Sequence, residues 1–405
     1  MRTIAVTGLG TISACGAGRG PLLAALTAGT PRLTEVPAPR GRHAGRARSA
    51  ALVDPAVLEA ALRGRDTRRM SPPSRLAIVA AAGALEEAGI APTGEPDPAL
   101  AVVASIAFGP SSFTTRLFDQ ILDEGPAAAS PALFTECVAN AAVAQVNVAV
   151  RASGPSYALA QGEAGPLRAV ARAASEIALG RARRALAGAV EEMPPVVHAF
   201  LDRLGALAAP AASGAGQGRP FDRERGGFHA AEGATFLLLE EESEARARGA
   251  AVAARLRGGG SAFDASAPAA GFGTGGARLG RALGAGLDRL GLGPAAIDLV
   301  VSGASGSRAG DRLEAEMLRE AWGGRALPPV LAPKAVTGEY GGAFLAAALL
   351  AVAGDGGGAR SWFGAADPAC GIVPHEGPIP RAARTVLVTS VAAGGCVSWL
   401  VLERA

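Results

Sequence analysis

The sequence predicts an α/β fold with largely parallel, buried sheets, arranged as two successive halves of similar order. Short apolar runs typical of strands alternate with helix-period stretches along the 405 residues, and this alternation produces α/β folds. The segment IDLVVSGAS at 297–305 faintly echoes the opening IAVTGLG at 4–10. A composition of 49% hydrophobic and 19% charged residues is that of a globular chain. We therefore expect one half at 1–250 and a second at 251–405.

Strands of the first half are expected where short apolar runs end at turn residues: at 3–7, 99–107, 157–160, 185–190 and 235–240. Helices are expected where apolar residues recur at helical spacing: at 20–29, 74–88, 113–122, 196–204 and 244–248. A further helix is expected from Leu167 to a stop at Gly180, because glycine commonly ends helices. His198 lies in an apolar helix, where a histidine is more often a core residue than a catalyst.

The second half repeats the alternation after a glycine-rich stretch at 258–276, which is expected to be a loop. Its helices are expected at 277–290, 312–322 and 342–352, and its strands at 297–302, 327–332, 385–390 and 397–403. Only the few residues 392–395 separate the last two strands, so these are expected to pair antiparallel.

Charge and cysteine usage exclude several classes of function. The net charge is +3, and the basic run at Arg40–Arg48 has no interleaved aromatic residues, so a solvated loop is expected rather than a nucleic-acid site. The four cysteines are scattered, which predicts neither a metal site nor a disulfide framework and favours a reducing compartment. No apolar run reaches the roughly 18 residues of a membrane helix. The chain opens directly with a strand and no signal peptide, so we expect a soluble, cytoplasmic protein.

The opening glycines do not predict a nucleotide cofactor. In MRTIAVTGLGTIS, Ser13 stands where the third glycine of a dinucleotide-binding fingerprint belongs, and no acidic residue follows at the expected distance. No cofactor and no metal ion is expected.

The most informative stretch is SYALAQGEAGPL at 156–167, a strand followed by a tight turn and a helix. A residue in such a turn lies at a helix N-terminus, where the backbone dipole favours negative charge. Enzymes that use this geometry place a nucleophile there. In this chain the residue is Glu163.

Seven segments, in order, resemble the β-ketoacyl synthases of the thiolase superfamily. They span almost the whole chain and are IAVTGLGTIS, RRMSPPSRLAIVAAAGALEEAGI, the elbow from Gly154, RPFDRERGGFHAAEGA, GSRAGDRLEAE, PKAVTGEYGGA and TSVAAGGCVSWLVL. The resemblance implies a five-layer αβαβα fold of two thiolase-like halves and dimerisation across the strand near Gly154.

The side chains that a condensing synthase needs are absent at the matching positions. The family's cysteine falls on Glu163, its first histidine on Gly303 and its second histidine on Glu339, whereas the lysine of the second histidine's segment is retained as Lys334. The phenylalanine gate, Gly-Phe-Gly-Gly, has become Ala392-Ala393-Gly-Gly. Condensation requires a thiolate to carry the acyl chain and donors to stabilise an enolate, so no catalytic residue for condensation is expected.

Within the superfamily this combination is similar to the chain-length factor of type II polyketide synthases, which usually carries glutamine at the elbow. The resemblance implies a heterodimer with an active ketosynthase, and an acyl carrier protein whose phosphopantetheine carries the growing chain. It also implies a tunnel bordered by the helix at 113–122, with these tunnel or interface candidates: Phe113, Arg116, Leu117, Gln120, Phe134 and Asn140.

Three alternatives remain open at this stage. Glu163 could promote decarboxylation of malonyl-carrier protein to supply a starter unit, although a carboxylate repels an enolate. Glu163 could instead be structural, held by the helix N-terminus and Lys334, with Glu163 or Glu339 kept protonated. The chain could also be a homodimeric degenerate ketosynthase with another acyl-transfer activity. The sequence does not distinguish an aromatic, polyene or fatty acyl product.

Overall fold

The computed structural model describes residues 3–37, 47–91, 94–208, 218–340, 342–355, 363–379 and 383–405. The basic run predicted to be a solvated loop falls largely within 38–46, outside the described residues.

Two groups of five strands share one internal order. The first group runs β6-β5-β7-β9-β1 and the second β12-β11-β13-β14-β10, and in each the first three strands are parallel and the last two antiparallel. Pairing of β1 with β10 at Ile4–Val6 and Ala254–Leu256 joins the groups edge to edge. The strands are β1 (Ile4–Ser13), β5 (Leu100–Ile106), β6 (Ser156–Ala160), β7 (Arg184–Glu191), β9 (Gly233–Glu241), β10 (Ala254–Phe263), β11 (Leu299–Ser302), β12 (Val330–Leu331), β13 (Thr385–Val391) and β14 (Cys396–Arg404).

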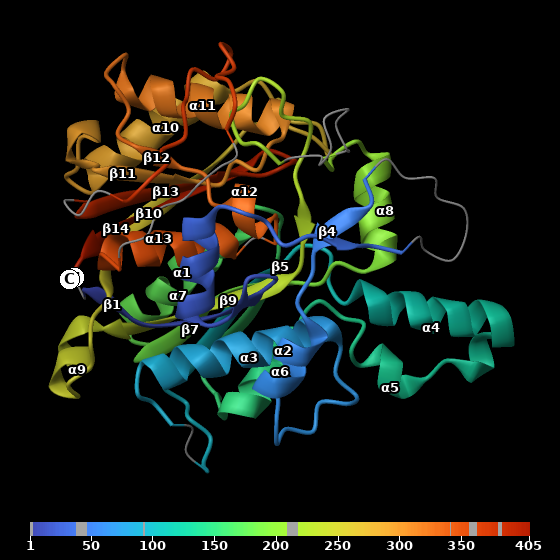
Figure 1. Ribbon diagram of the computed structural model, residues 1–405. Helices are drawn as coiled ribbons and strands as arrows, with labels where there is room; N and C mark the ends of the chain where they lie inside the picture. Colours follow the sequence, from blue (N-terminus) through green and yellow to red (C-terminus); the bar gives the residue numbers. More distant parts are fainter. Residues whose placement is uncertain are drawn as a thin grey trace.

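The molecule is a five-layer αβαβα fold, visible from bottom to top in Figure 1. The outer helices α3 (Pro72–Glu87) and α6 (Ala141–Val150) cover the first strand group, and α10 (Gly276–Arg289) and α11 (Arg308–Trp322) cover the second. The central layer between the two groups holds α7 (Gly165–Ala178) and α13 (Ala343–Ala353). The expected five-layer fold class is confirmed.

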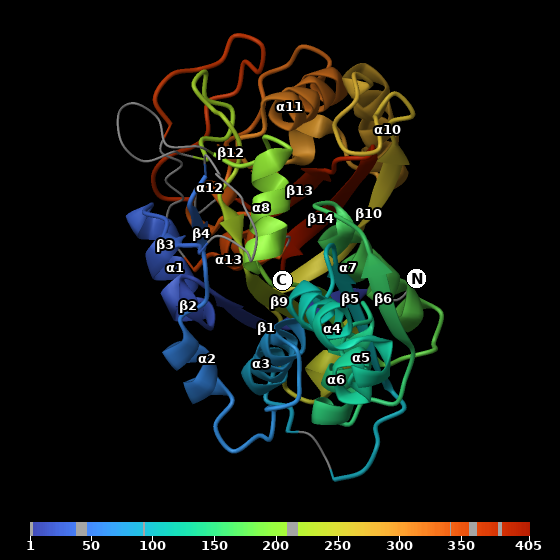
Figure 2. The same ribbon diagram turned by 90° about the vertical axis from the view of Figure 1, so that its right-hand side faces the viewer.

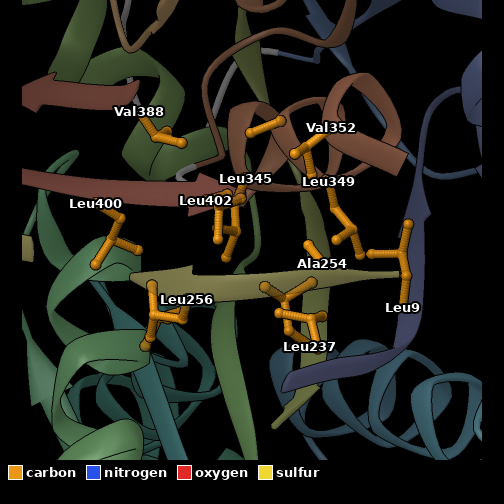
Figure 3. Packing of buried hydrophobic residues seen from close by; sticks show 14 of the residues in the cluster. Leu9, Leu237, Ala254, Leu256, Leu345, Leu349, Val352, Val388, Leu400 and Leu402 are labelled. Carbon is orange, nitrogen blue, oxygen red and sulfur yellow. The ribbon is translucent and has the colours of Figure 1, made fainter. Parts of the chain in front are cut away.

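The central layer is where the core is most apolar. Helix α13 has the sequence AFLAAALLAVA and is buried on nearly all sides, as expected for a helix without a polar face. Figure 3 shows Leu345 of α13 beside Leu402 of β14 and Leu349 of α13 pointing toward Leu9 of β1, and all four belong to one buried cluster. Both halves thus pack onto one shared core, which holds the turn before α7 in a fixed position.

The remaining elements lie around this frame, and Figure 2 shows α4 and α5 on the side that carries β6. They are α1 (Arg19–Ala28), α2 (Pro55–Ala61), α4 (Ser111–Glu124), α5 (Pro131–Phe134), α8 (Pro195–Arg203), α9 (Glu242–Ala247), α12 (Lys334–Thr337), β2 (Gly16–Ala17), β3 (Thr34–Glu35), β4 (Ser49–Ala51), β8 (Ala230–Ala231) and two 3₁₀ turns at Pro126–Ala128 and Pro294–Ala296. None of the helices in the described ranges is long and apolar enough to cross a membrane.

Three sequence predictions about the fold are wrong. The glycine-rich stretch at 258–276 is a loop only between residues 264 and 275, because residues up to Phe263 belong to β10 and α10 begins at Gly276; a Cβ at Gly260 would lie 2.5 Å from the Trp399 ring. The sheets are mixed rather than largely parallel. Strand β9 pairs antiparallel with both β7 and β1, and β14 pairs antiparallel with both β13 and β10. Strand β6 is not buried: it is the outer strand of its group and is partly exposed.

Other predictions hold closely. Strands β13 and β14 pair antiparallel, from Thr385 with Glu403 to Val391 with Val397. His198 is buried, with Nε2 3.2 Å from the carbonyl oxygen of Ser49, and so is a core residue. Division of the chain into domains at residue 250 stays a prediction.

Candidate functional site

Glu163 lies in a tight turn between β6 and α7. The turn closes through a hydrogen bond from the Gly165 N–H to the carbonyl oxygen of Gly162 at 2.8 Å. Position 165 admits only glycine without rearrangement, since a Cβ there would lie 2.0 Å from Ser105 Oγ. Ser105 also donates to the carbonyl oxygen of Gln161 at 3.1 Å, so β5 sets the position of the turn.

The two positions expected to face Glu163 come from the second half of the chain. Lys334, at the start of α12, is fully buried, and its Nζ lies 2.5 Å from Glu339 Oε2. The ammonium also lies 4.6 Å from the centre of the Phe344 ring, a cation–π distance. Glu339 itself is anchored by its backbone N–H, which donates to the carbonyl oxygen of His229 at 2.8 Å.

The Glu163 carboxyl is in an environment that disfavours its charged form. Burial raises its pKa to about 7, and the negative charge of Glu339 adds to the rise. The backbone N–H groups of Glu163 and Ala393 and the charge of Lys334 oppose it. Glu163, Glu339, Lys334 and Ala393 are therefore brought together: two carboxyl groups and one buried ammonium, which is ion-paired with Glu339.

Gly303 is packed too tightly to carry a side chain. A Cβ there would lie 2.7 Å from Ser390 Oγ and 2.8 Å from the carbonyl oxygen of Thr389. The Gly303 N–H donates to Glu314 Oε1 at 3.3 Å, and Thr389 Oγ1 donates to the same oxygen at 2.5 Å. Burial raises the pKa of Glu314 to about 7. A histidine at position 303 would require the backbone or its neighbours to move.

A pocket of about 690 Å³ reaches the Glu163 turn. Its walls are mainly apolar, with Phe108, Phe200, Leu204, Phe228 and Phe272 among them, and Glu163, Glu339 and Ala393 also line it. In the part of the chain that the structure describes, neither cysteine nor histidine lines this pocket. Ala392 is buried beside it, its N–H donating to the carbonyl oxygen of Cys396 at 2.8 Å.

The tunnel candidates lie elsewhere, around α4 and α5. Phe113, Arg116 and Gln120 line a separate, shallower hollow of about 540 Å³, and none of the six candidates lines the Glu163 pocket. Phe113 and Leu117 are buried, whereas Phe134 is 63% exposed and Asn140 is also exposed. Their contribution to a tunnel stays a prediction.

Sequence reasoning overlooked two buried acids at the end of β7. Glu191 and Glu192 are 5% and 2% exposed. Burial raises the pKa of Glu191 to about 8 and that of Glu192 to about 7. The signal was present, because two consecutive glutamates directly follow the apolar run LAGAV, and buried acids need dedicated partners. Among the described residues, no cluster of His, Cys, Asp and Glu has the arrangement of a metal site.

Comparison with known proteins places this geometry in a family. The model of the β-ketoacyl synthase N-terminal domain matches residues 1–245, and that of the C-terminal domain matches residues 253–354. The chain belongs to the β-ketoacyl synthase family. Glu163 lies within the matched N-terminal domain, and Gly303 and Glu339 lie within the matched C-terminal domain. Their assignment as altered ketosynthase site positions stays a prediction.

The relatives of this ketosynthase-like chain include subunits of type II polyketide synthases. It is 33% identical to the tetracenomycin polyketide synthase ketoacyl synthase beta subunit of Streptomyces glaucescens, over 81% of this chain and 80% of that protein. It is 34% identical to 3-oxoacyl-[acyl-carrier-protein] synthase 2 of Mycobacterium tuberculosis, over 60% of this chain and only 58% of that protein. The solved ishigamide ketosynthase/chain length factor superposes with a TM-score of 0.89, 26% identity and coverage of 100% of this chain and 99% of that chain.

Proposed function

We propose that this chain is a non-condensing chain-length factor, which pairs with an active ketosynthase and shapes the tunnel in which an acyl chain grows. The observation that carries the proposal is the charge of the pocket. By the family resemblance Glu163 and Glu339 fall on the positions of the thiol and of one imidazole; both line the pocket, and Lys334 pairs with Glu339 and acts electrostatically on Glu163. Condensation requires a thiolate that accepts the acyl group and imidazoles that stabilise the enolate, and among the described residues neither a cysteine nor a histidine lines this pocket.

Packing at Gly303 supports the same conclusion. In an active site the first histidine would point into the pocket, but here Ser390 and Thr389 fill the space that its Cβ would need. The site is therefore repacked around the missing side chain. A single substitution does not restore a synthase from this arrangement.

The surface beside β6 supports pairing with a second subunit. As the outer strand of its group, β6 leaves one backbone edge without a strand partner among the described residues, and such edges readily pair with another chain. Helices α4 and α5 lie on the same side of the fold as β6 (Figure 2). These helices and the segment after them carry exposed apolar residues: Phe118, Leu122, Phe134 and Val138. An apolar surface beside an open strand edge fits a partner subunit.

The alternative role, as a malonyl-carrier-protein decarboxylase, fits the pocket less well. Decarboxylation creates an enolate, and Glu339, on which the resemblance aligns the family's second histidine, lines the pocket with a carboxyl group. Placing a third negative charge beside two carboxyls is costly. The discriminating assay incubates malonyl-carrier protein with the heterodimer after the partner's cysteine is blocked. Release of CO₂ that depends on Glu163 would favour the decarboxylase.

The experiment that tests the proposal is reconstitution with the cognate ketosynthase. We expect one-to-one co-purification, product formation only when both subunits and an acyl carrier protein are present, and a changed product length for Phe113→Ala. The matched control is Val373→Ala, because Val373 is 63% exposed and lies far along the chain from α4. A stable homodimer that makes product without a partner would overturn the proposal.

A further inference from the structure

The segment 107–112 connects the two hollows of this half of the molecule. It follows β5 and ends in the first turn of α4. Phe108, near its start, lines the pocket that reaches Glu163. Phe113, directly after it, lines the hollow on α4. The course of these six residues therefore determines where α4 begins relative to the Glu163 pocket.

Glu191 and Glu192 hold this segment at both ends. Glu191 accepts the N–H of Ala107 on Oε2 at 2.7 Å and that of Phe108 on Oε1 at 3.2 Å. Glu192 accepts the N–H of Ser112 on Oε1 at 2.8 Å and the Ser112 hydroxyl on Oε2 at 2.7 Å. All four carboxyl oxygens are thus used, and every one binds the segment.

Helix α4 depends on this arrangement because it lacks a cap of its own. Its N-cap residue is Pro110, which makes no side-chain hydrogen bond to the first turn. The first backbone N–H groups of a helix need acceptors from outside the helix. Glu192 provides one from β7, so the start of α4 is tied to a strand of the core rather than to its own preceding residues.

Among the described residues no ion pair includes Glu191 or Glu192. The neighbouring charges that act on their pKa values are carboxyls as well: those of Glu192 and Glu339 on Glu191, and that of Glu232 on Glu192. Buried acids of this kind are stabilised by the hydrogen bonds they accept. The role of these two acids in the structure is therefore to hold the segment whose N–H and hydroxyl groups they accept.

We propose that Glu191 and Glu192 are positioning residues that fix segment 107–112, and through it the wall that α4 presents to the growing chain. This inference rests on the proposed chain-length function. It adds a determinant of product length that lies outside α4, at the end of β7.

Substitutions at the two acids have different expected outcomes, which makes the test sharp. In Glu192→Gln the amide oxygen still accepts from the Ser112 N–H and the NH₂ donates to the Ser112 hydroxyl, so this variant retains the clamp. In Glu191→Gln the NH₂ faces a backbone N–H, donor against donor, so this variant breaks one contact. Glu192→Ala removes both contacts at its end. The control is Glu240→Gln, a buried acid bound to Thr7 and Arg248 on β9.

The first readout is hydrogen exchange of the Ala107, Phe108 and Ser112 amides in the purified heterodimer. We expect at least about tenfold faster exchange in Glu191→Gln and Glu192→Ala, and near wild-type protection in Glu192→Gln and Glu240→Gln. Unchanged protection in Glu192→Ala would overturn the clamp.

The second readout is the length of the product made with the cognate ketosynthase. Glu191→Gln and Glu192→Ala should broaden or shift the distribution of product lengths, and Glu192→Gln should keep the wild-type distribution. Lost protection with unchanged product length overturns the positioning role. Phe113→Ala then distinguishes the two proposals. If product length shifts in Phe113→Ala but not in the Glu191 and Glu192 variants, the chain-length function stands and the positioning role fails. If product length shifts in none of these variants, both proposals are overturned.

Discussion

Ser390 contacts both Glu163 and Gly303. Its Oγ donates to the backbone carbonyl oxygen of Glu163 at 2.9 Å, and the same oxygen occupies the space that a Cβ at Gly303 would need. The position of the elbow and the absence of a side chain at position 303 are therefore linked through one hydroxyl on β13.

This link predicts the effect of restoring a side chain. Gly303→Ala should destabilise the protein by about 1–3 kcal/mol, because the new methyl group overlaps Ser390 and the Thr389 carbonyl. Ser390→Gly should cost less on its own, and the double variant should recover part of the loss, giving a favourable coupling energy. Urea unfolding of the four proteins measures it. Additive losses would show that Ser390 does not cause the clash.

The buried ion pair makes a second prediction. Lys334→Met should lower the free energy of unfolding by about 3–5 kcal/mol near pH 8, because it leaves the Glu339 carboxylate, whose side chain is only 9% exposed, without its cation. The double variant Lys334→Met/Glu339→Leu should regain most of this, since an apolar pair replaces an ion pair well.

A surface ion pair provides the control for that experiment. Arg68 lies 3.4 Å from Asp66 with side chains 91% and 80% exposed, so Arg68→Met should change stability by less than about 1 kcal/mol. If Lys334→Met costs no more than Arg68→Met, the lysine is not the cation that holds this site.

The alternation of elements in the sequence was sufficient to predict most helices and strands and the expected duplication. It failed where contacts between distant segments decide the outcome. Gly260 resembles a loop residue locally but is glycine because Trp399 packs on it. The antiparallel pairing of β9 with β1 joins residues far apart in sequence, which periodicity does not report. The two halves therefore each contain a mixed sheet where a parallel one was expected.

The candidate site was likewise predictable only in part. The resemblance placed Glu163, Glu339 and Lys334 near one another, and the structure brings them together. The clamp by Glu191 and Glu192 was missed, because its partners are backbone N–H groups of a segment some 80 residues earlier, and backbone groups leave no signature in a sequence.

The exposed apolar surface beside β6 predicts which substitutions weaken pairing with the ketosynthase. Leu122 is 79% exposed on α4, so Leu122→Asp should leave the subunit folded but weaken its pairing with the ketosynthase, by roughly tenfold or more. Size-exclusion chromatography of mixed subunits measures the pairing, and thermal unfolding of the lone subunit checks its fold. Val373→Asp, at an apolar residue elsewhere that is 63% exposed, should pair normally. Equal pairing of both variants with the ketosynthase would place the interface on another face.

The raised pKa of Glu163 predicts how stability depends on pH. Its pKa is about 7 in the folded protein and near 4.5 for an ordinary glutamate, so the folded state holds the proton more tightly than the unfolded state does. The contribution of this group to stability is fully present below about pH 4.5 and is lost as the pH rises through about 7. Glu163→Gln cannot titrate, so it avoids this loss.

Glu163→Gln should therefore match the wild type in stability at pH 4 and exceed it by about 1–3 kcal/mol at pH 8, with the difference growing between these values. Urea unfolding at pH 4, 6 and 8 measures it. Glu339→Gln is the matched control with the opposite sign, because it leaves the Lys334 ammonium without its 2.5 Å partner and should be less stable at pH 8. If Glu163→Gln is the less stable protein at pH 8, Lys334 stabilises the Glu163 carboxylate more than burial and Glu339 oppose it, and Glu163 is ionised at neutral pH.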